Sequence, residues 1–342
     1  MAGAGRKELR QLRLRAEASN GAGGTPRFLW RGPVEGIEDQ RETTFAEENI
    51  GILGGADRTY TAKLGAGLEI AETEATYEQL PDLLLMTGMG TFGGNWAGSA
   101  QGASGSTAVF TLLVPGGTIF PSQSYVAEAG DDAFAETTTY LVGDEVTLTF
   151  KGGEAMKVSA SLTGRNGTAT NAMGSFSAAG TLVQVEEILA GMGTFYLTPA
   201  GSSWGTGQVT TGNILEGEIT FTPTWAYKFP VDAGRLDFGT AVLTGYSVEG
   251  NLTLEHQVSG TYGVAGSAGQ VQKWRTETPQ LLQMVWPGGA ITEGTTYTSK
   301  LLDIRLPIKW QTIEKLSDMD GNDVRVASFI SKYAEDTRSE ER

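Results

Sequence analysis

The most constraining feature of this sequence is an alternation of apolar and polar residues with a period of two, which recurs in several segments. In residues 302–310, every second residue is Leu, Ile or Trp. This period places successive side chains on opposite faces of a β-strand, so one face is buried and the other is solvated. Pro307 has no backbone N–H, and we therefore expect this strand to lie at a sheet edge or to contain a bulge.

The same alternation predicts further strands at residues 146–150, 156–162, 219–221 and 248–255. Strands with one apolar face are typical of antiparallel sheets that are buried on one side only. The chain also has 48 glycines in 342 residues, and this enrichment favours short strands joined by turns. We therefore expect a mainly β protein.

Helical periodicity is scarce and predicts two short helices. Residues 77–86 form the better candidate, with Thr76 and Gln79 as a possible capping box and Gly88 at the end. Residues 279–284 form the second candidate, with Thr278 as N-cap and Pro279 at the first helical position.

The two predicted helices resemble each other, and each has a predicted strand before and after it. Pro81, Leu83, Leu84 and Met86 correspond to Pro279, Leu281, Leu282 and Met284. This order suggests two tandem β-sandwich or barrel domains, each with a short flanking helix. The expected organisation is an N-terminal arm at 1–25, a first domain at 26–165, a linker at 166–180, a second domain at 181–335, and a charged tail at 336–342.

Two glycine-rich segments, 88–106 and 120–139, carry few periodic apolar residues and are predicted to be long loops. In an assembly such loops could reach a neighbouring subunit. In a monomer they would be mobile lids or tips.

The composition excludes several classes of chemistry. The chain has no cysteine, which rules out disulfides, thiolate zinc sites and cysteine nucleophiles. It has one histidine, His256, and we expect no enzyme. The net charge of −15 disfavours a protein that grips nucleic acid, and it fits either a surface past which DNA slides or any acidic soluble protein. The sequence contains no run of 18 apolar residues, so no membrane span is predicted.

Three local motifs are interpreted structurally. Gly88, Gly90 and Gly93 match the spacing of a dinucleotide-binding loop, but they follow a helix and precede none. Residues 318–323 (DMDGND) lack the glycine and glutamate positions of a calcium loop and predict a tight turn between strands. His256 falls on the apolar face of its strand and is expected at the edge of the core.

The tryptophans raise the possibility of a sugar-binding platform. Trp225, Trp274, Trp286 and Trp310 lie in or beside predicted elements, so packing is the expected role. Trp96 lies in a glycine-rich segment and could anchor on a neighbouring subunit or contact a ligand.

Four segments resemble the tail tube (major tail) proteins of siphophages, which have long non-contractile tails. They are residues 12–36, residues 74–88, the strand pair 146–150 and 157–165, and residues 306–329. The resemblance implies a β-sandwich or barrel with a flanking helix, whose copies join sheets into rings that stack into a virion tail tube. A chain with one such unit would form rings of six, and a chain with two would form rings of three. It also implies partners such as the tape measure and terminator proteins, and DNA that passes through the lumen without specific binding.

The first hypothesis is therefore a homo-oligomeric structural protein, with no catalytic, cofactor-binding or metal-binding residues. The alternative is a carbohydrate-binding or adhesive β-sandwich on a virion or cell surface, which predicts one patch of exposed aromatic rings and a stable monomer. A third hypothesis is a glycoside hydrolase with two carboxylates facing each other across a cleft.

Overall fold

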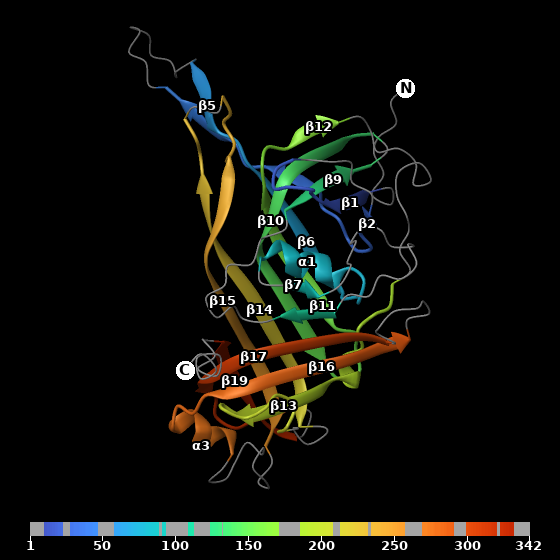
Figure 1. Cartoon of the computed structure of the whole chain (residues 1–342), viewed down its shortest axis with the longest axis vertical. Coiled ribbons are helices and arrows are strands. Elements are labelled where there is room, and N and C mark those ends of the chain that lie inside the picture. The colour runs from blue at the N-terminus through green and yellow to red at the C-terminus, as the bar shows by residue number, and fades with distance from the viewer. Residues whose placement is uncertain are drawn as a thin grey trace.

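The computed structural model confirms a mainly β protein (Figure 1). It describes residues 10–22, 28–46, 58–88, 91–93, 109–112, 124–131, 133–170, 185–207, 213–231, 234–256, 269–290, 299–319 and 322–331. Everything said below about the structure concerns these residues.

The N-terminal half contains twelve strands and one α-helix. They are β1 (Gln11–Ala16), β2 (Phe28–Leu29), β3 (Ile37–Asp39), β4 (Glu42–Phe45), β5 (Thr59–Lys63), β6 (Ala66–Glu74), α1 (Leu80–Met86), β7 (Thr91–Gly93), β8 (Val109–Leu112), β9 (Tyr125–Gly130), β10 (Ala135–Lys151), β11 (Lys157–Gly164) and β12 (Thr168–Thr170).

The C-terminal half contains longer strands, a short 3-10 helix and one α-helix. They are η2 (Ala190–Met192), β13 (Thr194–Pro199), β14 (Ile214–Lys228), β15 (Thr240–Glu255), α3 (Gln270–Arg275), β16 (Gln280–Ala290), β17 (Ser299–Ile313), β18 (Ser317–Met319) and β19 (Asn322–Ser331).

Strand β10 organises the fold because it belongs to two sheets of one barrel-like system. Its first half pairs with β9 and β12, and β9 pairs with β1. Its second half lies between β11 and β14. Between Thr138 and Leu141 the register shifts, and Tyr140 adopts a positive φ of 53°. A bulge of this kind bends a strand, which allows β10 to pass from one sheet into the other.

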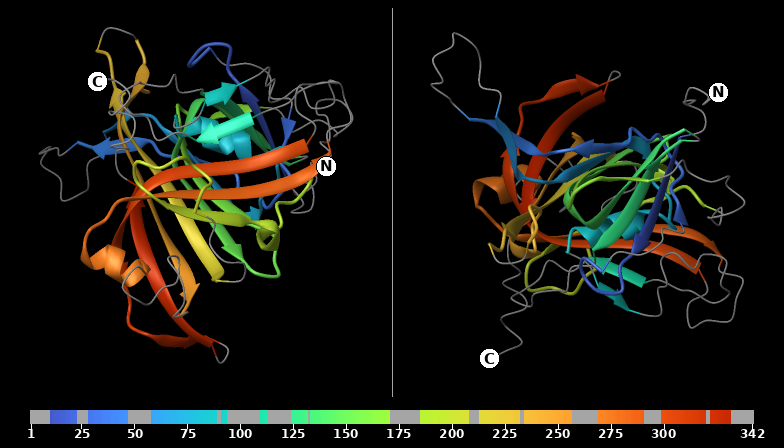
Figure 2. Two further views of the ribbon diagram at one scale, coloured as in Figure 1. Left: turned by 60° about the horizontal axis from the view of Figure 1, so that its bottom comes forward. Right: turned by 90° about the horizontal axis from the view of Figure 1, so that it is seen from above.

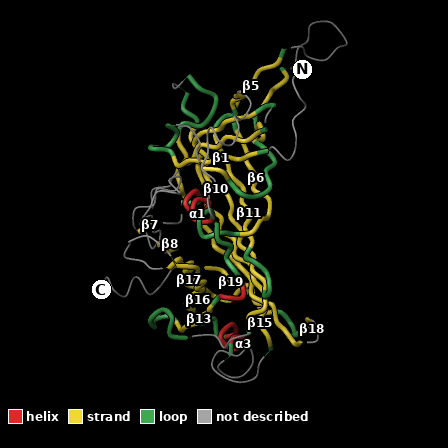
Figure 3. Tube along the Cα trace, turned by 90° about the vertical axis from the view of Figure 1, so that its right-hand side faces the viewer, coloured by secondary structure: helices red, strands yellow, loops and turns green. Residues whose placement is uncertain are grey.

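The larger sheet runs without interruption through both halves of the chain. Its strand order is β3-β6-β11-β10-β14-β15-β19-β17-β16-β13 (Figures 1 and 3). The smaller sheet contains β2, β1, β9, the first half of β10, and β12. The buried side chains on the inner face of the larger sheet form one continuous hydrophobic core with α1 and the smaller sheet. The core therefore spans the two segments that the sequence predicted as separate domains.

The predicted strands are confirmed. Every second residue of 302–310 is buried within β17, and β11 shows the same alternation over residues 157–164. Pro307, however, does not mark an edge, because β17 has strands on both sides. It lies in a gap between the pairing of β8, at residues 303–304, and the pairing of β19, which begins at Ile308. The proline is accommodated where one side of the ladder is interrupted.

The first predicted helix is confirmed, but it starts three residues later, at Leu80. The hydroxyl of Thr76 accepts a hydrogen bond of 3.2 Å from the backbone N–H of Gln79, which is part of the predicted capping interaction. Gly88 follows the helix with a φ of +71°, a left-handed conformation that glycine adopts without strain.

The second predicted helix is wrong. Residues 280–290 form β16, which pairs with β13 on one side and with β17 on the other. The helix in this region is α3, which ends before Pro279. An isolated helical turn of six residues has little stability of its own, whereas β13 and β17 offer backbone hydrogen-bond partners on both sides of this segment. The correspondence with residues 81–86 therefore does not extend to secondary structure, and it no longer supports a duplication.

Two further expectations concern connections. The loop predicted at 120–139 is wrong over most of its described length, because it contains β9 and the start of β10. Within 88–106, only Gly88, which follows α1, and β7 are described. Residues 11–16 of the expected arm form β1, in which Leu12 and Leu14 are buried. Part of the expected linker forms β12, and the charged tail lies outside the described residues.

Two ribbons project from the body of the molecule (Figures 1 and 2). One is the β4–β5 hairpin, which forms a two-stranded sheet of its own. The other is the distal part of the β14–β15 hairpin, beyond the pairing of β14 with β10 at Phe221 and of β15 with β19 at Val248. Below we call these the β4–β5 ribbon and the β14–β15 ribbon.

Candidate assembly surfaces

The outer face of the larger sheet is hydrophilic and acidic. Rows of side chains in register cross the strands from β6 to β15. One row contains Glu69, Ser161 and Glu145; the next contains Ser159, Thr147, Thr220 and Glu249; the third contains Glu74, Lys157, Thr149, Glu218 and Asn251. We call this surface the acidic face.

The opposite side of the same strands is apolar apart from Thr73, which is buried in register with Val158. Ile70, Ala160, Val146, Phe221 and Val248 form one row in register and are all buried. The sheet therefore separates a dry core from a solvated wall, as expected from strands that alternate strictly. This pattern continues from the N-terminal into the C-terminal half without a break.

Negative charge on the acidic face is only partly balanced. Lys157 lies 3.5 Å from Glu72, and Lys151 lies 3.9 Å from Glu216. Glu69, Glu145 and Glu218 form no ion pair with any described residue. Threonine and serine hydroxyls fill the space between the charges, as in the contact of 3.2 Å between Thr147 and Thr220. The surface offers mainly hydroxyls and carboxylates, and its lysines Lys151 and Lys157 each lie close to a glutamate.

A shallow hollow lies on the acidic face. Its lining includes Glu35, Glu69 and Glu145, together with Ser159 and Ser161. No group of three or more His, Cys, Asp or Glu side chains in the described part of the chain could hold a metal ion. The hollow therefore brings carboxylates near one another without forming a coordination site.

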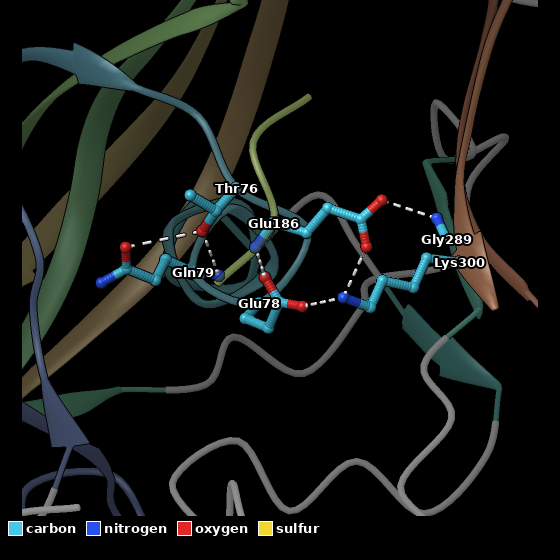
Figure 4. A network of polar contacts seen from close by, with 6 residues as sticks. All are labelled: Thr76, Glu78, Gln79, Glu186, Gly289 and Lys300. Atoms are coloured by element: carbon cyan, nitrogen blue, oxygen red, sulfur yellow. Dashed lines mark hydrogen bonds and ion pairs between the residues drawn. The ribbon is translucent and has the colours of Figure 1, made fainter. Parts of the chain in front are cut away.

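An ion-pair cluster joins α1 to the C-terminal hairpin (Figure 4). Lys300 of β17 contacts the carboxylates of Glu78 and Glu186, the latter at 2.8 Å. Glu186 also accepts a hydrogen bond of 2.6 Å from the backbone N–H of Gly289, and its own N–H donates to Glu78 at 2.9 Å. We call these residues the joint.

The electrostatics of the joint favour its charged form. Hydrogen bonding to Lys300 lowers the pKa of Glu186. Burial lowers the pKa of Lys300, but its hydrogen bonds to Glu186 and Glu78 outweigh burial, and the net shift is upward. Beside it, burial and the two glutamates raise the pKa of Tyr77 to about 12, and its hydroxyl donates to the carbonyl of Trp286 at 3.3 Å.

A second cluster fixes the end of the β14–β15 ribbon, next to the turn between the two strands. Arg165, at the end of β11, is buried and donates hydrogen bonds to the carbonyls of Phe238, at 2.8 Å, and Gly239. It also donates to Gly21 at 3.2 Å, and its guanidinium lies 4.6 Å from the ring centroid of Tyr140. Burial lowers the pKa of Arg165. Arg165 thus contacts the segment after β1, strand β10 and the end of the ribbon at the same time.

Large apolar side chains are exposed on both ribbons. They are Phe45 and Tyr60 on the β4–β5 ribbon, and Phe229, Val231 and Leu236 on the β14–β15 ribbon. Val231 is fully exposed, at 103% relative accessibility. The ribbons also contact each other, because Leu64 donates its N–H to the carbonyl of Leu236 at 3.0 Å. Exposed apolar side chains that gather in one place are typical of interaction sites.

The structure shows where the motifs discussed in the sequence analysis lie. His256 is half-buried, and its Nδ1 accepts a hydrogen bond of 3.4 Å from Nε of Arg325. In residues 317–324, β18 and β19 pair as a hairpin, as predicted for a turn between strands. Gly88 follows α1, Gly93 is the last residue of β7, and Gly90 lies outside the described residues.

The described tryptophans are buried or half-buried. Trp286 and Trp310 are buried, whereas Trp225 and Trp274 are half-buried and donate indole hydrogen bonds to backbone carbonyls. Trp96 lies outside the described residues. The joint and the Arg165 cluster were not found from the sequence, because a single lysine or arginine next to a strand carries no signal of its distant partners.

No family model and no curated protein matches the chain. In the described part of the chain, no helix has the length and apolar character needed to cross a membrane.

Proposed function

We propose that this chain is the tail tube protein of a siphophage, a structural protein that assembles into rings stacked around a lumen. The observation that carries the proposal is the acidic face: one uninterrupted sheet with a continuous apolar core behind it and a wall of glutamate and hydroxyl side chains in front. In this proposal the acidic face lines the lumen, and no residue performs chemistry.

The physical reason is the behaviour of DNA near such a wall. Cationic side chains would bind phosphates and release counterions, so each one would hold the polymer in place. Glutamates repel the phosphates, and threonine and serine hydroxyls keep the wall hydrated. A conduit therefore benefits from the excess of carboxylates that the outer rows of the sheet carry.

Assembly is supported by the ribbons. They project beyond the core and expose aromatic and aliphatic side chains that a stable monomer would normally bury. Contact with further copies of the chain would remove both these side chains and the unpaired ribbon edges from water. The number of copies per ring, three or six, is part of the proposal and depends on whether each chain supplies two units or one. Partners would be other tail proteins, such as the tape measure and terminator proteins, and the location would be the virion tail.

The first test is electron microscopy and light scattering of the purified chain over a range of concentrations. We expect rings or tubes with a central hole that grow with concentration. A monomer that persists at all concentrations, particularly one that binds glycans in an array, would contradict the proposal and favour the carbohydrate-binding alternative.

The second test concerns the lumen wall. Tubes carrying Glu145→Lys and Glu218→Lys should co-sediment with double-stranded DNA at low salt and release it as salt rises, whereas wild-type tubes should not bind. The variant Glu145→Gln with Glu218→Gln serves as a control that removes charge without adding cations. If the lysine variant assembles and binds no more DNA than wild type, the acidic face does not line the lumen.

A further inference from the structure

The end of the β14–β15 ribbon exposes apolar side chains next to two cations, Lys228 and Arg235. Phe229, Val231 and Leu236 are exposed there, and Lys228 beside them forms no ion pair with a described residue. Arg235 is exposed, and its only ion pair with a described residue is with Asp237, two residues along the chain, at 2.6 Å. Ion pairs of exposed side chains are weak, so Arg235 can turn to another carboxylate. Residues 228–239 contain two basic and two acidic residues, so this end lacks the excess of negative charge that gives the whole chain a net charge of −15.

The ribbon end is also braced. The ring of Phe229 lies 6.5 Å from that of Phe238, centroid to centroid, and the ammonium of Lys63 lies 5.2 Å from the Phe229 ring. Arg165 holds the carbonyls of Phe238 and Gly239 from below. The exposed side chains are therefore presented on a supported element, which lowers the entropy lost on binding.

A complementary surface lies at the turn between β9 and β10. A hollow there is lined by apolar Val34, Ile37 and Phe134 and by acidic Glu35, Asp131 and Glu136, with Arg10 as its only cation. Phe134 is half exposed, at 52%. We call this surface the acidic hollow.

The acidic hollow is fixed by backbone hydrogen bonds. The carboxylate of Asp131 accepts from the N–H of Ala133 at 2.8 Å and of Phe134 at 3.0 Å. These bonds to the backbone lower the pKa of Asp131, which keeps it ionised. The turn thus presents an aromatic ring and a stable negative charge together.

The two surfaces lie on opposite sides of the body, so they cannot meet within one molecule. The ribbons stand on one side in Figures 1 and 2, and β1 and β9 lie on the other. We propose that the β14–β15 ribbon end of one copy of this chain docks into the acidic hollow of a second copy. This contact rests on the proposed function, for which it supplies the repeating link. Because the two patches differ, the contact is heterologous and propagates from copy to copy, closing a ring if the rotation permits.

The natural absence of cysteine allows a direct test. Val231→Cys and Phe134→Cys are introduced into separate full-length chains, which are mixed and oxidised. We expect a disulfide-linked dimer that forms only in the mixture, and a ladder of oligomers when one chain carries both changes. The control mixes Val231→Cys with Leu189→Cys, whose side chain is 54% exposed but lies far along the chain next to η2.

A charge exchange gives a second readout. Lys228→Glu and Glu136→Lys should each raise the concentration needed for assembly about tenfold, which corresponds to about 1.4 kcal/mol, and the double variant should restore it. If wild-type chains assemble but the Val231–Phe134 mixture links no faster than the control, the ribbon contact is wrong while the proposed function stands. If wild-type chains do not assemble at all, the proposed function itself fails.

Discussion

Two segments with nearly the same letters adopt different structures in this molecule. Residues 81–86 (PDLLLM) belong to α1, whereas residues 279–284 (PQLLQM) lead into and form β16. Both are buried, and both contact the same core through Leu84 and Leu282. Apolar content therefore decided that each segment is inside, and the available backbone partners decided its conformation.

The buried polar side chain of each segment has its own hydrogen-bond partners. Asp82 and Gln280 occupy corresponding places, and each is 1% exposed. Asp82 accepts a hydrogen bond of 2.6 Å from the hydroxyl of Tyr125. Gln280 accepts from Lys273 at 3.0 Å and donates to Gln270 at 2.8 Å. The partner of Asp82 comes from β9, whereas the partners of Gln280 come from α3.

The largest expected effect comes from truncating the shared leucine in each segment. Leu84→Ala and Leu282→Ala should each lower the free energy of unfolding by about 2–5 kcal/mol, because both side chains are fully buried. Alanine favours helix and is depleted in strands, so the loss should be larger in β16. Urea unfolding of both variants measures the difference. Equal losses would mean that local propensity plays no part in the contrast.

A smaller effect is expected at the buried carboxylate of α1. Tyr125→Phe removes a hydroxyl that donates to Asp82, and the loss should be about 1–3 kcal/mol. Tyr60→Phe, on the exposed β4–β5 ribbon, is the matched control and should leave stability unchanged. A Tyr125→Phe variant as stable as wild type would show that the hydrogen bond does not support the helix position.

Exchanging the next corresponding pair should matter less. Gln283 of β16 donates to both oxygens of Asp303, at 2.9 and 3.1 Å, and Gln283→Leu should cost about 0.5–1.5 kcal/mol. Arg305 continues to hold Asp303, which limits the loss. Leu85→Gln makes the reverse change in α1, where the side chain is half-buried. Thermal unfolding measures the loss of stability in both variants. A larger loss for Leu85→Gln than for Gln283→Leu would show that packing around α1 tolerates the exchange less well than packing around β16.

The smallest effect is expected at the joint, where the start of α1 meets the end of β16. The pKa of Glu186 is lowered, so its contribution is present above its ordinary pKa and is lost as pH falls through the folded value. The pKa of Lys300 is raised, so its contribution is present below its ordinary pKa and is lost at higher pH.

Lys300→Met should therefore destabilise the protein between roughly pH 5 and pH 10, and the difference from wild type should shrink outside that range. Glu186 is 36% exposed, so solvent screens the pair, and the loss should stay within about 1 kcal/mol. Lys315→Met is an exposed control. A pH-independent difference between Lys300→Met and wild type would show that packing, rather than charge, explains the effect.

The sequence by itself determined the class of the fold. Strict alternation in residues such as 302–310 and 157–164 required strands with one dry face, and the same alternation placed Glu145, Thr147 and Thr149 on the solvated side. It also determined α1, because Thr76 and Gly88 supply local signals for where a helix begins and ends. These features depend on neighbours within a few residues, which a sequence shows directly.

Only the tertiary structure decided the rest. It made residues 280–290 a strand because β13 and β17 lie on either side, and it turned part of a predicted loop into β9 because β1 and β10 offered their edges. It also assembled the joint and the Arg165 cluster from residues far apart in the chain. The physical reason is that backbone hydrogen bonds and buried charges must be satisfied by whichever groups the fold brings near, and local sequence does not specify those groups.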